Sequence, residues 1–527
     1  MSSTVAASRA RAENAGIEST ANDPPSRPRL VATDFFSLYR PSECDLRVWL
    51  RARDVEEAPP SPYSQVLIEL GVAHERRHLA RFPNHIDLGD VAIDERVART
   101  RELVAENERV IYQGALRAEA TLTGTEVEIV GVPDFLLPAR AGYAIRDSKL
   151  ARRIGGGRNR AIELQLATYG WLYEQTFGEP PVALQVHNGA GVIADIPYGG
   201  GEAALQTLER ILSDRLTEQE PAEPVAWGKC SGCAFFDRCW PRAVERRSVG
   251  LLPWAGAGLI GELERRGLMT IDQLLERYDA ESLAELERPW GGKTKQVGEA
   301  APRILAGARA LAEDRPIVLE PPAIPAHPSY VMFDLEGLPP QLDELEKIYL
   351  WGMQVFGERP SGFRAATAGF GHNGDRDGWF TFLAEAAAIF AEHGDIPFVH
   401  WASYERSKID LYLERYGDRD GVAARVKANL LDLLPITYES VALPLSSYSL
   451  KEIEKLAGYE RRLEESGGEW SMARYIEATE TEDAAARDPI MAEILAYNRE
   501  DLAATWAVME WLRGLARAAG GTAEARV

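Results

Sequence analysis

The spacing of apolar and polar residues predicts a short unstructured start followed by two helices. The first thirty residues are rich in Ala, Ser, Arg and Pro and contain no apolar run, which predicts a disordered tail over residues 1–30. Ordered structure is expected to begin at Thr33, where a capping position precedes a helix that runs past Cys44 toward Leu50. A second amphipathic helix carries His74.

A mixed pattern of strands and one helix follows. The strand pattern covers residues 113–121, 127–137, 143–150 and 182–187, and a helical pattern covers 161–177. Strands that are separated by a crossover helix favour an α/β fold. We therefore expect the first domain, which ends just after three closely spaced cysteines, to span residues 31–246.

The pattern changes twice more along the chain. Short helices are expected over residues 247–315, where Thr270 begins one of them with a capping-box arrangement. Prolines crowd residues 316–328, which predicts a semi-rigid linker. A strand at Tyr330 begins a second α/β domain, expected over residues 329–527. The predicted fold class is therefore an α/β multidomain protein with a small helical middle.

Two glycine motifs in the middle segment have the form of phosphate-binding elements. Gly256-Ala257-Gly258 precedes a helix that Gly267 ends, and the pair of short helices resembles a helix-hairpin-helix, whose backbone N–H groups bind phosphate. An ordinary helical connector fits the same spacing. Gly291-Gly292-Lys293-Thr294 resembles the end of a P-loop, but Glu287 stands where that pattern requires its first glycine. No ATPase or helicase motor is expected.

Composition and charge describe a globular protein with an acidic overall field. The 527 residues are 45% hydrophobic, carry a formal charge of −22 and contain no apolar run of the ~20 residues that a membrane span requires. Because that field repels nucleic acid, a nucleic-acid site has to be a local basic patch. Residues 146–160 provide one, with six basic residues and one acid, although a solvated loop is the alternative.

The four cysteines form a one-plus-three arrangement. Cys44 stands alone, whereas Cys230, Cys233 and Cys239 lie within ten residues. Disulfide frameworks belong to short secreted chains, so this spacing indicates a metal site and a reducing, cytoplasmic compartment. One remote cysteine with a Cys-x2-Cys-x5-Cys run is closer to iron–sulfur ligation than to the paired ligands of structural zinc. Zinc and four unrelated buried thiols remain the alternatives.

Two neighbouring predicted strands carry the first set of candidate catalytic residues. Asp134 lies in one strand and Asp147 in the next, so a hairpin would bring both carboxylates to one end of the sheet. Two carboxylates that hold a divalent cation, with Lys149 to orient water and stabilise developing charge, meet the needs of metal-dependent phosphodiester cleavage. His74 is a candidate third ligand, and a structural histidine is the alternative.

Gln165 and Tyr169 are four residues apart and share one helical face, either beside substrate and the lysine or as the polar edge of a packed helix. The motifs, in the order His74, Pro133-Asp134, Asp147-Ser148-Lys149 and Gln165-x3-Tyr169 within the four-cysteine frame, resemble the RecB-like nucleases of the PD-(D/E)XK superfamily. The likeness is to their iron–sulfur branch, and it covers about residues 31–246.

The resemblance implies a 4Fe–4S cluster on the four cysteines, which would tie the beginning of the domain to its end. It also implies that Asp134, Asp147 and His74 hold Mg or Mn. One position departs from the family, because many relatives have glutamate where this chain has Asp147. The shorter side chain still ligates a metal but could alter the metal preference.

The C-terminal domain carries a second acidic set. Asp334 and Glu336 are two apart on a predicted strand and so share a face, and Tyr497 and Asp501 are one helical turn apart. Two divalent ions about 4 Å apart require several such acids, while a tyrosine positions the water. These motifs resemble the DEDD exonucleases of the ribonuclease H-like fold, over about residues 328–515.

The middle motif of that family departs in this chain. Glu405, after a predicted strand, stands where the family has aspartate, and Asp432 competes for the same role. The segment Tyr448–Lys451 is a candidate substrate-side loop. We expect Glu405 to be the third acid; a pocket that could not hold two ions would make the domain a binding or weakly active remnant.

Together the resemblances imply a metal-dependent DNA nuclease, expected to act as an exonuclease on single-stranded ends in DNA repair or processing. One alternative is a non-catalytic iron–sulfur adaptor that binds nucleic acid and recruits a helicase partner, which the absent motor and the altered middle motif favour. Another is RNA processing, because the C-terminal fold acts on both polymers and no motif reports on the 2′-hydroxyl.

Overall fold

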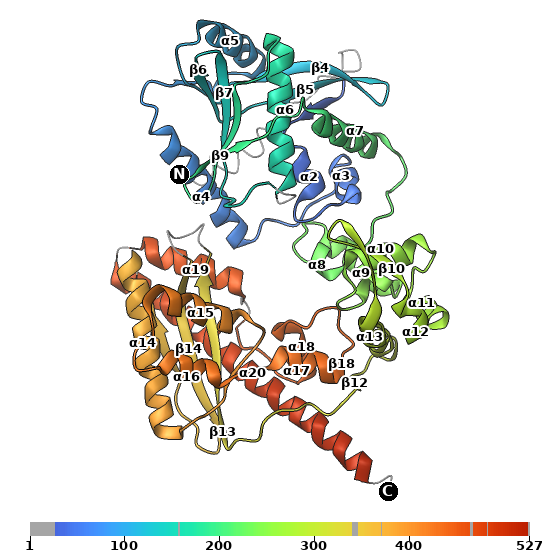
Figure 1. Cartoon of the computed structure of the whole chain (residues 1–527), viewed down its shortest axis with the longest axis vertical. Coiled ribbons are helices and arrows are strands. Elements are labelled where there is room, and N and C mark those ends of the chain that lie inside the picture. Colours follow the sequence, from blue (N-terminus) through green and yellow to red (C-terminus); the bar gives the residue numbers. More distant parts are fainter. Residues whose placement is uncertain are drawn as a thin grey trace. The chain divides into compact units, whose positions relative to one another are not determined.

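The chain, described here by a computed structural model, divides into two compact units (Figure 1). The described residues are 27–155, 159–339, 346–369, 371–463, 467–481 and 483–524. Unit 1 comprises the residues up to 60, 64–223 and 232–235, and unit 2 comprises 61–63, 224–231 and the residues from 236 onward. The predicted disordered tail lies outside the described residues except at its end, where β1 (Arg29–Val31) pairs with β5 (Thr125–Gly131), so ordered structure begins earlier than predicted.

Unit 1 is built from two sheets that share a covering helix. Its strands are β1, β2 (Ile86–Asp87), β3 (Ile111–Tyr112), β4 (Leu116–Leu122), β5 (Thr125–Gly131), β6 (Phe135–Ala139), β7 (Gly142–Ser148), β8 (Ala183–His187) and β9 (Ile193–Ile196). Its helices are α2 (Phe35–Tyr39), α3 (Asp45–Arg51), α4 (Pro62–Leu79), α5 (Ile93–Glu106), α6 (Arg160–Phe177) and α7 (Glu202–Leu216). The sheets have the orders β2-β3-β6-β7-β8-β9 and β1-β5-β4, and α6 packs on strands of both (Figure 1).

The strand and helix boundaries confirm some predictions for unit 1 and correct others. The predicted hairpin forms between β6 and β7, and α6 and β8 lie where expected. The single strand predicted over 127–137 is wrong, because β5 and β6 belong to different sheets and the chain crosses between them around Pro133, which has no backbone N–H to donate. The helix predicted to run past Cys44 is two helices, with Pro41 in the break and Cys44 at the N-cap of α3.

A small helical segment with its own core begins unit 2. Its elements are α8 (Trp227–Cys230), α9 (Phe236–Glu245), η1 (Val249–Leu251), α10 (Gly256–Arg265), α11 (Ile271–Arg277), α12 (Ala280–Ala284), β10 (Glu287–Trp290), β11 (Lys293–Gln296), η2 (Gly298–Ala300) and α13 (Ala301–Glu313). The predicted capping box at Thr270 is confirmed. Gly258 lies inside α10, where a Cβ atom would come within 2.4 Å of the Pro289 carbonyl oxygen, so this glycine allows β10 to approach the helix.

The rest of unit 2 is a five-stranded sheet of order β15-β14-β13-β16-β17 with helices on both faces (Figure 1). Its elements are β12 (Ile317–Val318), β13 (Ser329–Leu338), β14 (Lys347–Gly357), β15 (Arg364–Thr367), α14 (Gly371–His393), β16 (Phe398–His400), α15 (Tyr404–Tyr416), α16 (Val422–Ala428), β17 (Leu430–Asp432), α17 (Leu433–Ser440), β18 (Val441–Ala442), α18 (Leu450–Leu456), α19 (Gly468–Glu480) and α20 (Ala484–Glu524). The predicted linker contains β12, which pairs with β18 and so is fixed to this domain.

The alternation of side chains along β13 decides which helix faces the acidic residues. Val331 and Phe333 pack with the core that lies under α14, α15 and α16. Tyr330 and Met332 point the other way and pack with Leu502 of α20. Because alternate residues share a face of a strand, Asp334 and Glu336 also point toward the α20 side. Within the described residues, no helix is long and apolar enough to cross a membrane.

Candidate active sites

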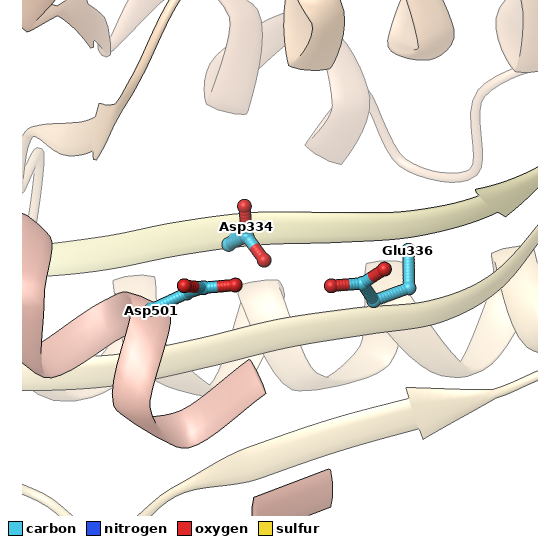
Figure 2. Close-up of side chains that lie close together, drawn as sticks. All are labelled: Asp334, Glu336 and Asp501. Atoms are coloured by element: carbon cyan, nitrogen blue, oxygen red, sulfur yellow. The ribbon is translucent and has the colours of Figure 1, made fainter. Parts of the chain in front are cut away.

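Three carboxylates meet where β13 passes α20. Asp334 and Glu336 come from the strand and Asp501 from the helix, and one oxygen of each lies within 4.8 Å of the others (Figure 2). Across the described ranges, no other three His, Cys, Asp or Glu side chains meet this closely. Carboxylate oxygens are the donors that Mg²⁺ and Mn²⁺ prefer, so the donor set fits the divalent ion that the resemblance implies.

Burial raises the pKa of all three acids, and repulsion between the carboxylates adds to this for Asp334 and Glu336. Burial, followed by the charges of Asp501 and Glu336, raises the pKa of Asp334 well above its ordinary value. Burial and the charge of Asp501 raise the pKa of Glu336 to about 8. Burial also raises the pKa of Asp501, although Arg461 opposes that shift. Buried acids that repel one another need a compensating positive charge, which a divalent cation would supply.

Neighbouring side chains orient the three carboxylates. Asn498 donates a hydrogen bond to Asp334 Oδ2 at 2.7 Å, and the Tyr349 hydroxyl donates to Glu336 Oε2 at 3.3 Å. Gly352, which pairs with Asp334 across the sheet, makes the first contact feasible, because a Cβ atom there would lie 1.7 Å from the Asn498 side-chain oxygen. Sequence reasoning missed Asn498, although it lies inside the Tyr-x3-Asp motif.

Arg461 is a second residue that the sequence motifs did not indicate. Its Nε and Nη2 donate to the two oxygens of Glu454 at 2.6 and 2.8 Å, and Nη2 also donates to Asp501 Oδ1 at 2.5 Å. Arg461 and Lys451 both lie within 6 Å of the Tyr497 ring, at 5.9 and 5.8 Å from its centroid. The acidic triad therefore has two cations beside it, of which Lys451 lies in the segment predicted to contact substrate.

The candidates for the middle acid have different surroundings. Glu405 is buried in α15 with Oε2 3.1 Å from His400 Nδ1, and its charge contributes to the raised pKa of Asp334. Asp432 caps α17, with one oxygen accepting the backbone N–H groups of Ala402 and Leu434 at 2.9 and 3.0 Å. Glu405 lies near the triad without joining its closest group, and Asp432 has a local structural role.

The first predicted acidic pair also comes together, at the end of the β6–β7 hairpin. The Asp134 backbone N–H donates to Asp147 Oδ1 at 3.0 Å, and the Ser148 backbone N–H donates to Asp134 Oδ2 at 2.7 Å. Lys149 Nζ lies 2.9 Å from Asp147 Oδ2. Burial and the charges of Asp147 and Glu75 raise the pKa of Asp134 well above its ordinary value. Burial alone would lower the pKa of Lys149, but the two aspartates outweigh it and raise that pKa.

Glu75 and Gln113 complete this group and were not predicted. Gln113 Nε2 donates to Glu75 Oε1 and to Asp134 Oδ1, both at 3.1 Å, and Tyr112 donates to the same glutamate oxygen at 2.6 Å. Gln113 also has a left-handed backbone with φ of 56°, which is uncommon for a side-chain-bearing residue and typical of functional sites. The only sequence signal was the place of Glu75 beside His74.

His74 lies in a stack of three histidine rings. Its ring is 4.3 Å from that of His187, which is 3.9 Å from that of His78. His74 Nε2 is 3.2 Å from the His187 carbonyl oxygen and must donate to it, which leaves Nδ1 with a lone pair for a metal. Although His74 and His78 are four residues apart on α4, each ring stacks on His187, so the two do not chelate one ion together. Burial and the nearby Arg146 lower the pKa of His78 to about 4.

The remaining predicted positions are the pair Gln165 and Tyr169 and the basic patch of residues 146–160. Gln165 Nε2 donates to the Tyr169 hydroxyl at 2.8 Å, and that hydroxyl donates to the Val132 carbonyl oxygen at 3.1 Å, so the pair braces the segment before Asp134. In the basic patch, Arg146 contacts Gln185 and His78, and Lys149 faces Asp147, so both cations are used internally. Arg152, Arg153 and Arg160 are exposed, whereas Arg158 lies outside the described residues.

The cysteines are partly buried and form no disulfide bond within the described chain. Cys44 and Cys233 belong to unit 1, where Arg47 Nη1 donates to Cys233 Sγ at 3.8 Å. The Ala58 backbone N–H donates to the Ala234 carbonyl oxygen at 2.9 Å, so residues 232–235 return to the segment that follows Cys44. Cys230 ends α8 and Cys239 lies in α9. A guanidinium donor beside Cys233 suits a metal-bound thiolate.

Comparison with known families gives one match for each of the two predicted nuclease-like domains. Residues 47–240 match the PD-(D/E)XK nuclease superfamily, and residues 331–513 match the RNase_H superfamily. The chain thus joins two hydrolytic domains of nuclease superfamilies that act on phosphodiester bonds, as predicted. The protein is a metal-dependent nuclease in this general sense. A structure titled "Crystal structure of SSO0001" is 13% identical, covers 45% of this chain and 94% of that chain, and has a TM-score of 0.26. No curated protein matches.

Proposed function

We propose that the protein is a DNA nuclease that cleaves from single-stranded ends in DNA repair or processing, with one active site in each domain. The observation that supports this proposal best is the buried triad of Asp334, Glu336 and Asp501. Bound Mg or Mn would activate water and stabilise the leaving oxygen. The chain's own residues orient the site: Asn498 fixes the rotamer of Asp334, and Tyr497, which hydrogen-bonds Asp501, would position the attacking water.

In the N-terminal domain we propose that Asp134, Asp147 and His74 hold the cation. The His187 carbonyl fixes the ring of His74, and the two backbone N–H bonds between strands hold both carboxylates at the end of the hairpin. Lys149, whose raised pKa keeps it charged at neutral pH, would bind a phosphate oxygen and stabilise the charge that develops there. Gln165 and Tyr169 support the loop before Asp134.

We further propose that Cys44, Cys230, Cys233 and Cys239 hold a 4Fe–4S cluster with a structural role. The contacts at Cys233 and Ala234 bring the beginning and the end of unit 1 together, as a cluster at this place would. Zinc on four thiolates is the competing assignment. Anaerobic purification followed by iron, sulfide and zinc analysis separates them, because only the cluster gives iron, sulfide and a brown colour.

The nuclease proposal is tested with end-labelled single-stranded DNA, duplex DNA and RNA in Mg²⁺ or Mn²⁺. We expect Lys149→Ala to remove one cleavage activity, Asp334→Ala to remove the other, and the double variant to cleave nothing. Release of mononucleotides from a labelled end would identify exonuclease action, and a preference for RNA would replace the DNA assignment. Wild-type cleavage by all three variants would show that both sites are wrongly assigned.

A non-catalytic adaptor that binds nucleic acid for a helicase partner is the second candidate. It is favoured by one observation, that Glu405 contacts His400 and stays outside the close acidic group. The adaptor function predicts binding of single-stranded DNA without hydrolysis at every metal concentration. The same titration with labelled DNA therefore decides between a nuclease and an adaptor.

A further inference from the structure

The β10–β11 hairpin presents an unusual surface in a strongly acidic chain. Its two-residue turn is Gly291-Gly292, with φ of 54° and 78°, the backbone that a tight hairpin turn requires and that glycine adopts without strain. Trp290, which precedes the turn, is 54% exposed. All four residues of β11 are exposed as well. The motif Gly291-Gly292-Lys293-Thr294, which resembles the end of a P-loop, therefore lies at the exposed turn of this hairpin.

The strand register places one aromatic ring and three cations on the same face. Trp290 pairs with Lys293, and Arg288 pairs with Lys295. Directly opposed residues of an antiparallel pair share a face, and so do residues two apart on one strand. These four side chains therefore point to one side. The Arg288 guanidinium lies 4.5 Å from the centre of the Trp290 ring, and Lys295 Nζ lies 5.8 Å from it.

The cations on this face lack acidic partners among the described residues. In the described part of the chain, no ion pair reaches Arg288, Lys293 or Lys295. Arg288 is 8% exposed, and its buried Nε has no hydrogen-bond partner. The buried guanidinium packs against the ring of Trp290 and so holds that side chain in place, which leaves the exposed Lys293 and Lys295 to meet an anion. The chain as a whole carries −22, which makes a local cluster of three cations more notable.

We propose that the β10–β11 hairpin is a binding site for single-stranded nucleic acid, separate from both cleavage sites. Trp290 stacks on an unpaired base through the exposed part of its ring, and the exposed Lys293 and Lys295 bind the neighbouring phosphates. Exposed aromatic rings beside backbone-binding cations are the general means of holding single strands without sequence preference. Duplex DNA keeps its bases stacked internally and cannot use the tryptophan in this way.

Binding is measured by fluorescence anisotropy with the full chain and a labelled thymidine oligonucleotide, in EDTA so that no cleavage occurs. A uridine ribo-oligonucleotide and a duplex are the comparison ligands. We expect Trp290→Ala to weaken single-strand binding by about 5- to 150-fold, since stacking of one base is worth about 1–3 kcal/mol. Trp290→Phe should recover most of it. The double variant Lys293→Ala/Lys295→Ala should lower the salt dependence by about 1.4 in log–log slope.

The control is Leu319→Ala, which removes an apolar side chain that is 42% exposed elsewhere in unit 2 and should bind within about twofold of wild type. Equal binding by Trp290→Ala, no recovery in Trp290→Phe, equal affinity for duplex, or no binding by the wild type would each overturn the proposal. Cleavage is scored separately: wild-type protein that binds through Trp290 but cuts nothing would remove the nuclease assignment and leave the hairpin site standing.

Discussion

The substitution Arg461→Gln tests the electrostatic balance of the C-terminal triad. In the absence of metal, Arg461 supplies positive charge to Asp501 and Glu454, and the exposed fractions of the three side chains are only 11%, 9% and 5%. Glutamine keeps a polar side chain of similar length but removes the charge. The carboxylates then lose their cation while remaining buried. We expect metal-free unit 2 to be destabilised and its response to metal to increase.

The magnitude follows from the burial of the pair. Breaking a buried ion pair by removing one partner costs about 3–5 kcal/mol. The lower end applies here, because the pKa of Asp501 is already raised and its carboxyl can take up a proton. About 3 kcal/mol corresponds to a fall in melting temperature of about 5 °C for a unit of about 300 residues, at about 2.1 cal/mol/K of unfolding entropy per residue. A bound divalent ion would no longer be repelled by the guanidinium, so we expect at least about tenfold tighter Mn²⁺ binding.

Calorimetric unfolding and titration with Mn²⁺ measure both effects in the full chain. The matched control is Arg474→Gln, which removes ion pairs to Glu477 and Glu493 whose acids are 55% and 50% exposed. Surface pairs of this kind contribute less than about 1 kcal/mol, so the control should unfold like the wild type and bind Mn²⁺ equally. The reasoning fails if Arg461→Gln matches the wild type in EDTA or if its Mn²⁺ affinity is unchanged.

Three further outcomes are expected. Gly352→Ala displaces Asn498, so it should lower the free energy of unfolding by about 1–3 kcal/mol and reduce cleavage by the C-terminal site in a nuclease assay. The control Gly362→Ala places its Cβ atom where no other atom lies within 4 Å, so stability and cleavage should both stay at the wild-type level. The pKa of His78 is about 4 in the folded protein against an ordinary 6.5, so the unfolded chain binds the proton more readily. The free energy of unfolding should therefore fall by about 3 kcal/mol as the pH drops from 6.5 to 4. Denaturant titrations of His78→Phe should show a smaller dependence of stability on pH. Cys233→Ala should lose iron and thermal stability together, and loss of iron with unchanged stability and cleavage would contradict a structural cluster.

Local periodicity explains how much of the site could be predicted. Asp334 and Glu336 share a face because strand side chains alternate, and Tyr497 and Asp501 share a helical face because they are one turn apart. The hairpin that joins Asp134 to Asp147 follows from two adjacent strand patterns. The failed strand over 127–137 shows the limit, because the alternation continues while the chain changes sheets at Pro133.

Local sequence patterns are enough to predict two nuclease-like domains, the order of their acidic motifs and the faces on which those acids lie, because each depends on residues close together in the chain. Tertiary structure alone decided which partners those acids have. Asn498 reaches Asp334 across 164 residues and Arg461 reaches Asp501 across 40, while Gln113 joins Glu75 to Asp134 from a strained turn. Such contacts depend on how distant segments pack against one another, and Gly352 allows one of them because it has no side chain. Packing of this kind cannot be predicted from the spacing of neighbouring residues.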